Sequence, residues 1–113
     1  MTQLPAAPAP ACPTEKLRFT RETSCRNDGS VEFCLPKDAQ VVERVRRLAP
    51  EIQGPMGGAG RIRCDLSRED LYFFPTDNRC LEPHGALTDE AWASLCRVAA
   101  DPAISGIAPT WYE

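Results

Sequence analysis

Six cysteines constrain this chain more than any other feature, and they stand at Cys12, Cys25, Cys34, Cys64, Cys80 and Cys96. No two of them have the close spacing that is typical of a zinc site or a CxxC redox centre. Because their number is even and their spread is wide, we predict three intramolecular disulfides and no free thiol. Disulfides persist outside the reducing cytosol, so the expected location is periplasmic, surface-attached or secreted. The alternative is six buried free thiols in a cytosolic protein.

Length and charge narrow the class of protein further. A chain of 113 residues predicts one domain. With 42% hydrophobic and 26% charged residues, a wholly disordered chain is not expected. The net charge of −3 argues against nucleic acid as a partner. No stretch approaches the roughly 20 apolar residues of a membrane span.

The N-terminal segment differs in composition from the rest. Residues 1–13 are rich in proline and alanine, so we predict a largely disordered tether there and a single domain over residues 14–113. The start lacks a basic region followed by a long apolar stretch, as a signal peptide would have. We therefore expect a mature form, with a lipid anchor upstream as one candidate attachment. Arginine outnumbers lysine by 11 to 2, which indicates GC-rich codons and a bacterial source.

A hairpin is predicted near the start of the domain. Residues 16–24 and 30–35 both alternate apolar and polar side chains, and Asn27-Asp28-Gly29 between them is a turn signal. A three-residue loop places the apolar side chains of both strands on one face, whereas a two-residue loop separates them. We therefore predict the three-residue loop.

Two helices carry clear start and stop signals. Residues 38–49 have helical apolar spacing, with Asp38 as the N-cap and Pro50 after the end. The segment 89–100 follows the N-cap Thr88, and Leu87 and Trp92 occupy the hydrophobic-staple positions.

The other strands are shorter. We predict strands over residues 61–66, with Ile62, Cys64 and Leu66 inward, and over 71–74, with a last strand within 104–113 that Pro109 interrupts. The expected fold is a small disulfide-stapled α+β domain in the order β-β-α-β-β-α-β. Its antiparallel sheet is packed by two helices.

The hairpin register also predicts which cysteines cannot pair. In this register Cys25 points to the core face and Cys34 to the other, so they should not bond. Cys25 would then reach Cys64 or Cys96, and Cys34 would reach Cys12 or Cys80.

Groups that perform catalysis are scarce in this sequence. The single histidine, His84, lies in a Pro-His-Gly context that is typical of a surface turn. No Gly-x-Ser-x-Gly elbow is present, and the glycine-rich stretch 54–60 lacks a phosphate-binding ending. We predict no catalytic residue, no metal site and no cofactor.

Charged clusters have ordinary explanations. Two acidic groups, namely Asp65, Glu69 and Asp70, and Asp89 and Glu90, fit capping turns better than a carboxylate pair. Five arginines, namely Arg44, Arg46, Arg47, Arg61 and Arg63, alternate with acids and fit a mixed-charge face.

These observations favour a small extracytoplasmic protein-binding module, either an inhibitor or an accessory of an envelope complex, over an enzyme. Its expected contact element is the loop with Pro55, Met56, Gly57 and Gly58, where an apolar side chain lies among glycines. Its partner would be another protein. The alternatives are a secreted hydrolase that uses paired carboxylates and a structural domain of a larger envelope complex.

Overall fold

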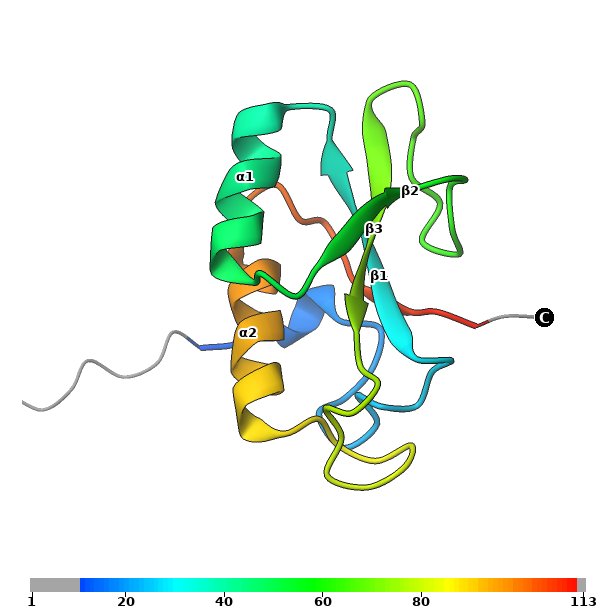
Figure 1. The fold of residues 1–113 in the computed structure, drawn as a ribbon, viewed down its shortest axis with the longest axis vertical. Helices are drawn as coiled ribbons and strands as arrows, with labels where there is room; N and C mark the ends of the chain where they lie inside the picture. The colour runs from blue at the N-terminus through cyan, green and yellow to red at the C-terminus, as the bar shows by residue number, and fades with distance from the viewer. Residues whose placement is uncertain (1–10, 112–113) are drawn as a thin grey trace, which may run out of the picture.

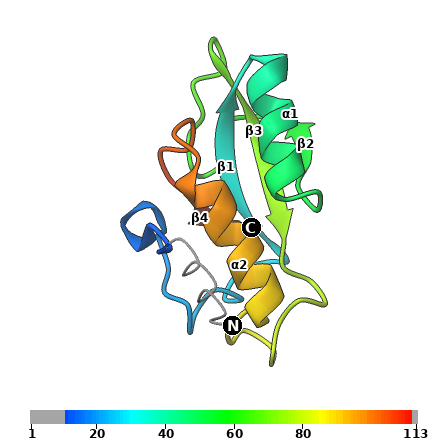
Figure 2. The same cartoon turned by 90° about the vertical axis from the view of Figure 1, so that its left-hand side faces the viewer.

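The computed structural model describes residues 11–111, which form a four-stranded antiparallel sheet with two helices on one face (Figures 1 and 2). The strand order is β2-β3-β1-β4. The elements in chain order are the 3-10 helix η1 (Thr14–Lys16), β1 (Ser30–Pro36), α1 (Ala39–Leu48), β2 (Gln53–Met56), β3 (Glu69–Pro75), α2 (Asp89–Ala100) and β4 (Ala108–Pro109). The predicted α+β class is confirmed. Of the predicted tether over residues 1–13, residues 1–10 lie outside the described residues.

Both predicted helices form where their capping residues indicate. Helix α2 spans Asp89–Ala100 as predicted, and the Thr88 hydroxyl accepts a hydrogen bond from the Ala91 amide at 3.3 Å. Helix α1 spans Ala39–Leu48, and the Asp38 carboxylate accepts one from the Gln40 amide at 2.9 Å. These side chains satisfy amides that have no partner within the helix, which fixes the first turn.

The main core lies between the helices and the sheet. Alternate residues of β1, namely Val31, Phe33 and Leu35, are fully buried against α1 and α2. Phe33 stacks beside Tyr72 of β3, with ring centroids 6.1 Å apart. Helix α2 contributes a buried stripe of Ala91, Leu95, Val98 and Ala99. This layer is an ordinary close-packed hydrophobic core.

The opposite face of the sheet is covered by an irregular segment, residues 60–64, rather than by a helix. Its buried cluster consists of Cys34, Cys64 and Leu71, with Ile62 and Phe73 packed against it. Glu32 of β1 is also buried on this face, and its carboxylate accepts a hydrogen bond from the Ile62 amide at 3.3 Å. The sheet therefore has one helix-covered face and one loop-covered face.

The predicted hairpin is wrong. Strand β1 pairs with β3 and β4, whereas residues 16–24 form no strand, and Leu17 makes only a parallel bridge to Ile107. The cause is local: the Thr20 amide donates to the Thr23 hydroxyl at 2.9 Å, and the Ser24 hydroxyl donates to the Arg21 carbonyl at 2.6 Å. Such side chain to backbone bonds favour turns over strands.

The predicted strand over residues 61–66 is also wrong, because that segment consists of turns. The Asp65 carboxylate accepts from both the amide and the hydroxyl of Ser67, which closes a turn where the strand was expected. Cys64 is buried as predicted, but the Leu66 side chain is 47% exposed. The predicted last strand is reduced to two residues, Ala108–Pro109.

The three predicted disulfides are present, and the described residues contain no free cysteine. The pairs are Cys12–Cys96, Cys25–Cys80 and Cys34–Cys64. Cys25 and Cys34 do not bond, as predicted, but the partners expected for each were wrong. They rested on the hairpin and on a strand over residues 61–66 that placed Cys64 on the core face, whereas Cys64 lies with Cys34 on the opposite face. Each bond joins an irregular segment to another part of the fold.

Candidate functional site

The predicted contact loop begins as the edge strand β2. Gln53 lies opposite Phe73 and Met56 opposite Leu71, so three steps along β2 match two along β3. One extra residue in an edge strand is a β-bulge, which re-aims the side chains that follow it. The part of the predicted loop over residues 54–56 is therefore held in a sheet. We call residues 53–58 the contact segment.

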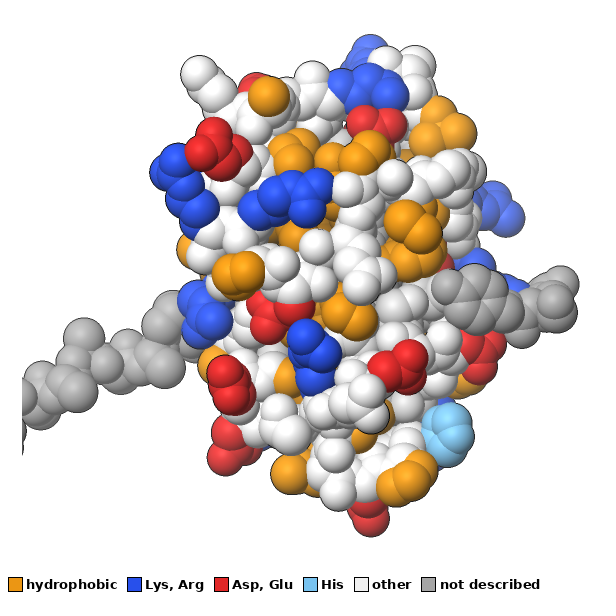
Figure 3. All heavy atoms as spheres, in the orientation of Figure 1, with side chains coloured by type: hydrophobic (Ala, Val, Ile, Leu, Met, Phe, Trp, Pro, Cys, Tyr) orange, Lys and Arg blue, Asp and Glu red, His pale blue; other side chains and the backbone are white. Residues whose placement is uncertain are grey.

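The contact segment presents an apolar side chain beside open space. Met56 is 42% exposed, and Pro55 before it is exposed as well. A Cβ atom built on Gly57 or Gly58 would meet nothing within 4 Å. Figure 3 shows apolar side chains at the surface over β2 and the segment that follows it. Met56 is thus accessible to a second molecule, and so is the chain that follows it.

The start of the contact segment is fixed by α1 and β3. Ile52, just before it, is buried, and the Arg46 guanidinium donates a hydrogen bond to the Gly54 carbonyl at 2.8 Å. The same guanidinium lies 5.7 Å from the centre of the Tyr72 ring. Gly54 has a φ of +147°, and a Cβ there would lie 2.5 Å from that ring. Only glycine fits this close approach of backbone to ring.

The chain after the contact segment is fixed by the loop-covered face. The Cys64 amide donates to the Ala59 carbonyl at 2.8 Å, and the Cys64 sulfur is bonded to Cys34 of β1. Gly60 has a φ of +67°, and a side chain there would overlap the carboxylate of Glu32. Only about four residues, 56–59, therefore lie between two anchored points.

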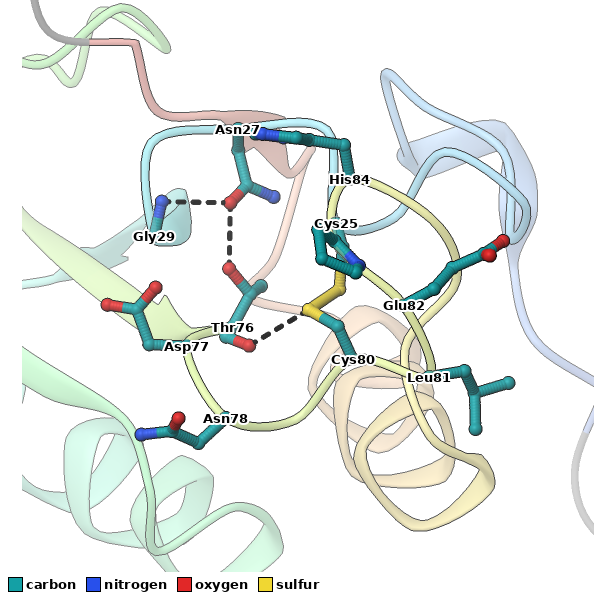
Figure 4. A pocket seen from close by; sticks show the side chains of 11 residues that line it. Cys25, Asn27, Gly29, Thr76, Asp77, Asn78, Cys80, Leu81, Glu82 and His84 are labelled. Carbon is teal, nitrogen blue, oxygen red and sulfur yellow. Dashed lines mark hydrogen bonds between the residues drawn. A yellow bond between two sulfur atoms is a disulfide. The ribbon is translucent and has the colours of Figure 1, made fainter.

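A cavity of about 360 Å³ lies at the other end of the sheet, around the Cys25–Cys80 disulfide (Figure 4). Asn27 fills one wall, where its side-chain oxygen accepts hydrogen bonds from the Gly29 amide at 3.1 Å and the Thr76 hydroxyl at 2.7 Å. Asp77 and Glu82 lie on opposite sides of the cavity in Figure 4. The carboxylates do not converge, so this cavity has no paired-acid geometry.

His84 borders the same cavity, and the sequence interpretation of its environment fits the structure. Its side chain is exposed and its φ is +59°, within a turn where the Gly85 amide donates to the Glu82 carbonyl at 3.1 Å. Among residues 11–111, no group of three or more histidine, cysteine or acidic side chains is arranged to hold a metal ion.

Four of the five acidic residues singled out from the sequence, namely Asp65, Glu69, Asp70 and Asp89, form hydrogen bonds or ion pairs within the fold. Asp65 accepts from Ser67, and the Glu69 carboxylate accepts from the Asp65 amide at 2.9 Å. Asp70 pairs with Lys37 at 2.7 Å, and Asp89 pairs with Arg21. The hydrogen bonds from Ser67 hold the pKa of Asp65 below its usual value. These contacts stabilise turns and element ends.

The five arginines are dispersed rather than gathered into a basic patch. Arg44 forms two hydrogen bonds to the buried carboxylate of Asp101, at 2.7 and 2.8 Å, and Arg47 pairs with Glu43 one turn away. The Arg61 guanidinium donates to the Trp111 carbonyl at 3.0 Å. The hydrogen bonds from Arg44 hold the pKa of Asp101 below its usual value, whereas burial raises the pKa of Tyr72. A mixed-charge surface results.

Comparison of the chain with known protein families, curated proteins and solved structures gives no match. Neither helix of the described part of the chain is long and apolar enough to cross a membrane.

Two exposed apolar residues, Leu81 and Trp111, were not predicted as candidate contact residues from the sequence. Leu81 is 69% exposed at the rim of the cavity, and Trp111 is exposed near the end of the described chain. A leucine next to Cys80 gave no signal, because its exposure depends on how the Cys25–Cys80 bond orients that loop. The contact segment was detectable, because an isolated methionine among glycines is visible in the sequence.

Proposed function

We propose that this chain is a small extracytoplasmic protein-binding module that contacts its partner through the contact segment, residues 53–58. The observation that carries this proposal is the position of Met56, which is 42% exposed on an edge strand and followed by two glycines with open space around them. An exposed apolar side chain on a backbone that is already ordered gains contact area on binding without the entropy cost of ordering that backbone.

The contacts that hold the contact segment at both ends support a role in binding, rather than a role as a simple connection between β2 and β3. Arg46 and Tyr72 hold the start of the segment, and the Cys34–Cys64 disulfide holds the chain after it. A loop that is already ordered before it binds loses less entropy on binding than a free one. Three disulfides fit a location outside the reducing cytosol, which is the location we propose.

A site-specific crosslinking experiment tests this proposal. A photoreactive amino acid replaces Met56 in one variant and Ala93, an exposed residue on α2, in a matched control. Both are irradiated with the secreted and envelope fractions of the source organism. We expect one adduct of defined mass at position 56, identified by mass spectrometry and absent at position 93.

A competition experiment shows whether the crosslinked adduct depends on the contact segment. Excess unlabelled wild-type protein should remove the adduct, whereas a Met56→Asp variant should not, since a charge cannot fill the apolar contact. The proposal is contradicted by equal adducts at both positions, or by equal competition from the wild-type protein and the variant.

A further inference from the structure

We propose that a groove beside β4 binds an acidic sugar unit, that is, one sugar ring that carries a carboxylate or sulfate group. The groove has a volume of about 270 Å³ and is lined by Arg18, Phe19, Thr23, Arg26, Pro109 and Trp111. β4 and β2 lie at opposite ends of the strand order, so this groove is separate from the contact segment. The sugar is therefore a second ligand, beyond the partner protein proposed for that segment.

Two arginines give the groove a positive charge that no neighbouring acid compensates. Arg18 and Arg26 are exposed, and neither guanidinium forms a hydrogen bond or an ion pair within the part of the chain that the structure describes. By contrast, Arg44 and Arg47 of α1 each pair with a carboxylate. None of the described residues that line the groove is acidic, although the whole chain has a net charge of −3. Because a guanidinium offers a fork of N–H groups that fits paired anionic oxygens, the groove attracts an anion.

Two aromatic side chains give the groove a flat apolar wall. Trp111 is 39% exposed, and Phe19 is half-buried against the main core. A sugar ring presents a face of C–H groups, which pack on the electron-rich face of an indole ring. The Thr110 amide donates to the Ser30 carbonyl at 3.0 Å. The Trp111 carbonyl accepts from the Arg61 guanidinium at 3.0 Å. The backbone that carries the indole is therefore ordered before binding, so binding does not cost the entropy of ordering it.

The size of the groove matches one ring rather than a larger molecule. Pockets that enclose drug-sized ligands have volumes of about 300–1,000 Å³. The volume of about 270 Å³ lies just below that range. Two arginines are also too few for nucleic acid, which proteins bind through many phosphate contacts. One ring with one anionic group therefore agrees with both the space and the charge.

The backbone beside the groove argues against an extended peptide as the ligand. Sheet edges recognise peptides through backbone hydrogen bonds. β4 has only two residues, and Pro109 has no amide hydrogen to donate. The chain next to it is already bonded, since the Ile107 amide donates to the Lys16 carbonyl at 2.8 Å and the Arg18 amide donates to the Ile107 carbonyl at 2.9 Å. Recognition in this groove therefore depends on side chains, which favours a ring with an anionic group.

Isothermal titration calorimetry with defined sugars tests the proposal. The probes are the trimer of galacturonic acid, a sulfated heparin disaccharide and the uncharged trimer of galactose. We expect at least one acidic sugar to bind the wild-type protein about 5-fold or more tightly than the neutral trimer, and the one that binds identifies the anionic group. Raising the NaCl concentration from about 0.05 to about 0.5 M should weaken that binding, because salt screens exposed charges.

Paired variants assign the binding to the groove. Arg18→Gln/Arg26→Gln should weaken binding of the acidic sugar by about 5-fold or more, because it removes both charged donors. Arg47→Gln/Arg68→Gln is the matched control: it removes the same charge from two exposed arginines outside the groove lining, and it should change the affinity by less than about 2-fold. Trp111→Ala should weaken binding by about 2–10-fold and leave its salt dependence unchanged, because only the ring contact is lost.

Three results would overturn the proposal: no binding of either acidic sugar at millimolar concentration, equal affinity for the acidic and neutral sugars, or equal losses in the two arginine pairs. Tighter binding of phenylacetate or of triglutamate than of either acidic sugar would also overturn it, since the groove would then select an aromatic acid or an acidic peptide. Circular dichroism and intact mass with three disulfides check the folding of each variant. The comparison of acidic with neutral sugars needs only the wild-type protein, so it decides the matter even where a variant does not fold.

Discussion

The two faces of the sheet are stabilised in different ways. The helix face buries a large apolar core in which Phe33, Leu95 and their neighbours pack closely. The apolar cluster on the other face is smaller and consists of Cys34, Cys64 and Leu71 among the described residues, beside the buried carboxylate of Glu32, and it is covered by an irregular segment. Close packing holds the first face, whereas a disulfide and a few specific contacts hold the second.

This difference determines where a binding segment can lie. On the helix-covered face, the apolar side chains that α1 and α2 turn toward the sheet are occupied by packing in the core. A face held by one covalent bond and a few hydrogen bonds allows the chain beside it to protrude, as residues 56–58 do. The protein thus keeps a stable core on one side and an accessible segment on the other.

Truncation of one phenylalanine on each face tests the comparison most strongly. Phe33 is fully buried against the helices, whereas Phe73 is only half-buried on the loop-covered face. We expect Phe33→Ala to lower the free energy of unfolding by about 3–5 kcal/mol, and Phe73→Ala to lower it by less than about half as much. Urea denaturation measures both. Equal losses would show that the two faces contribute alike.

Removal of the Cys34–Cys64 bond should have the next largest effect. The bond closes a loop with a sequence separation of 30 residues, so replacing both cysteines by alanine should cost about 2–4 kcal/mol. Amide hydrogen exchange should accelerate over residues 57–68 while α2 stays protected. Faster exchange in α2 itself would contradict the separation of the two faces.

Two glycines on one loop give a matched pair with a smaller effect. Gly60→Ala should cost about 2 kcal/mol, because its φ is positive and the new methyl group would overlap Glu32. Gly57→Ala should be neutral or stabilising by less than about 1 kcal/mol, because nothing lies near that position. Thermal unfolding compares them, and similar melting temperatures would mean that residues 60–64 do not pack on the sheet.

The smallest expected effect lies at the end of α2. Asp101→Asn removes the charge that accepts hydrogen bonds from Arg44, and it should cost about 1 kcal/mol at neutral pH. Because folding lowers the pKa of Asp101, its contribution is complete above the unfolded-state pKa of about 4 and is lost as the pH falls below it. The two proteins should therefore differ in stability at pH 7, and the difference should shrink as the pH falls below about 4 in urea titrations. A stability difference between the two proteins that stays constant across this pH range would exclude a link between the ionisation of Asp101 and folding.

The sequence alone was sufficient to predict those elements whose start and stop signals lie in neighbouring residues. Thr88 and the staple residues defined α2 to the residue, and Asp38 defined the start of α1, since capping depends on a few neighbouring side chains. The hairpin failed because the turns formed by Thr20, Thr23 and Ser24 outweigh a short apolar alternation. The true partners of β1 lie far along the chain in β3 and β4, and alternation alone does not specify a partner.

The candidate site was predictable to a similar extent. The composition of residues 54–60 indicated an exposed loop with one apolar side chain, and Met56 is indeed exposed. That the loop begins as an edge strand was not predictable, because the pairing depends on Tyr72 and on the contact between Arg46 and Gly54. The cavity around Cys25 and Cys80 could not be found without the disulfide connectivity.

The Cys12–Cys96 bond has a consequence for how the molecule can be presented. It fastens the beginning of the described chain to α2, and Figure 1 shows this segment beside α2, on the side away from β2 and the loop after it. A sensor surface or a carrier protein coupled on the N-terminal side of Cys12 would therefore hold the molecule by its helix layer. The contact segment would then be turned toward the surrounding solution.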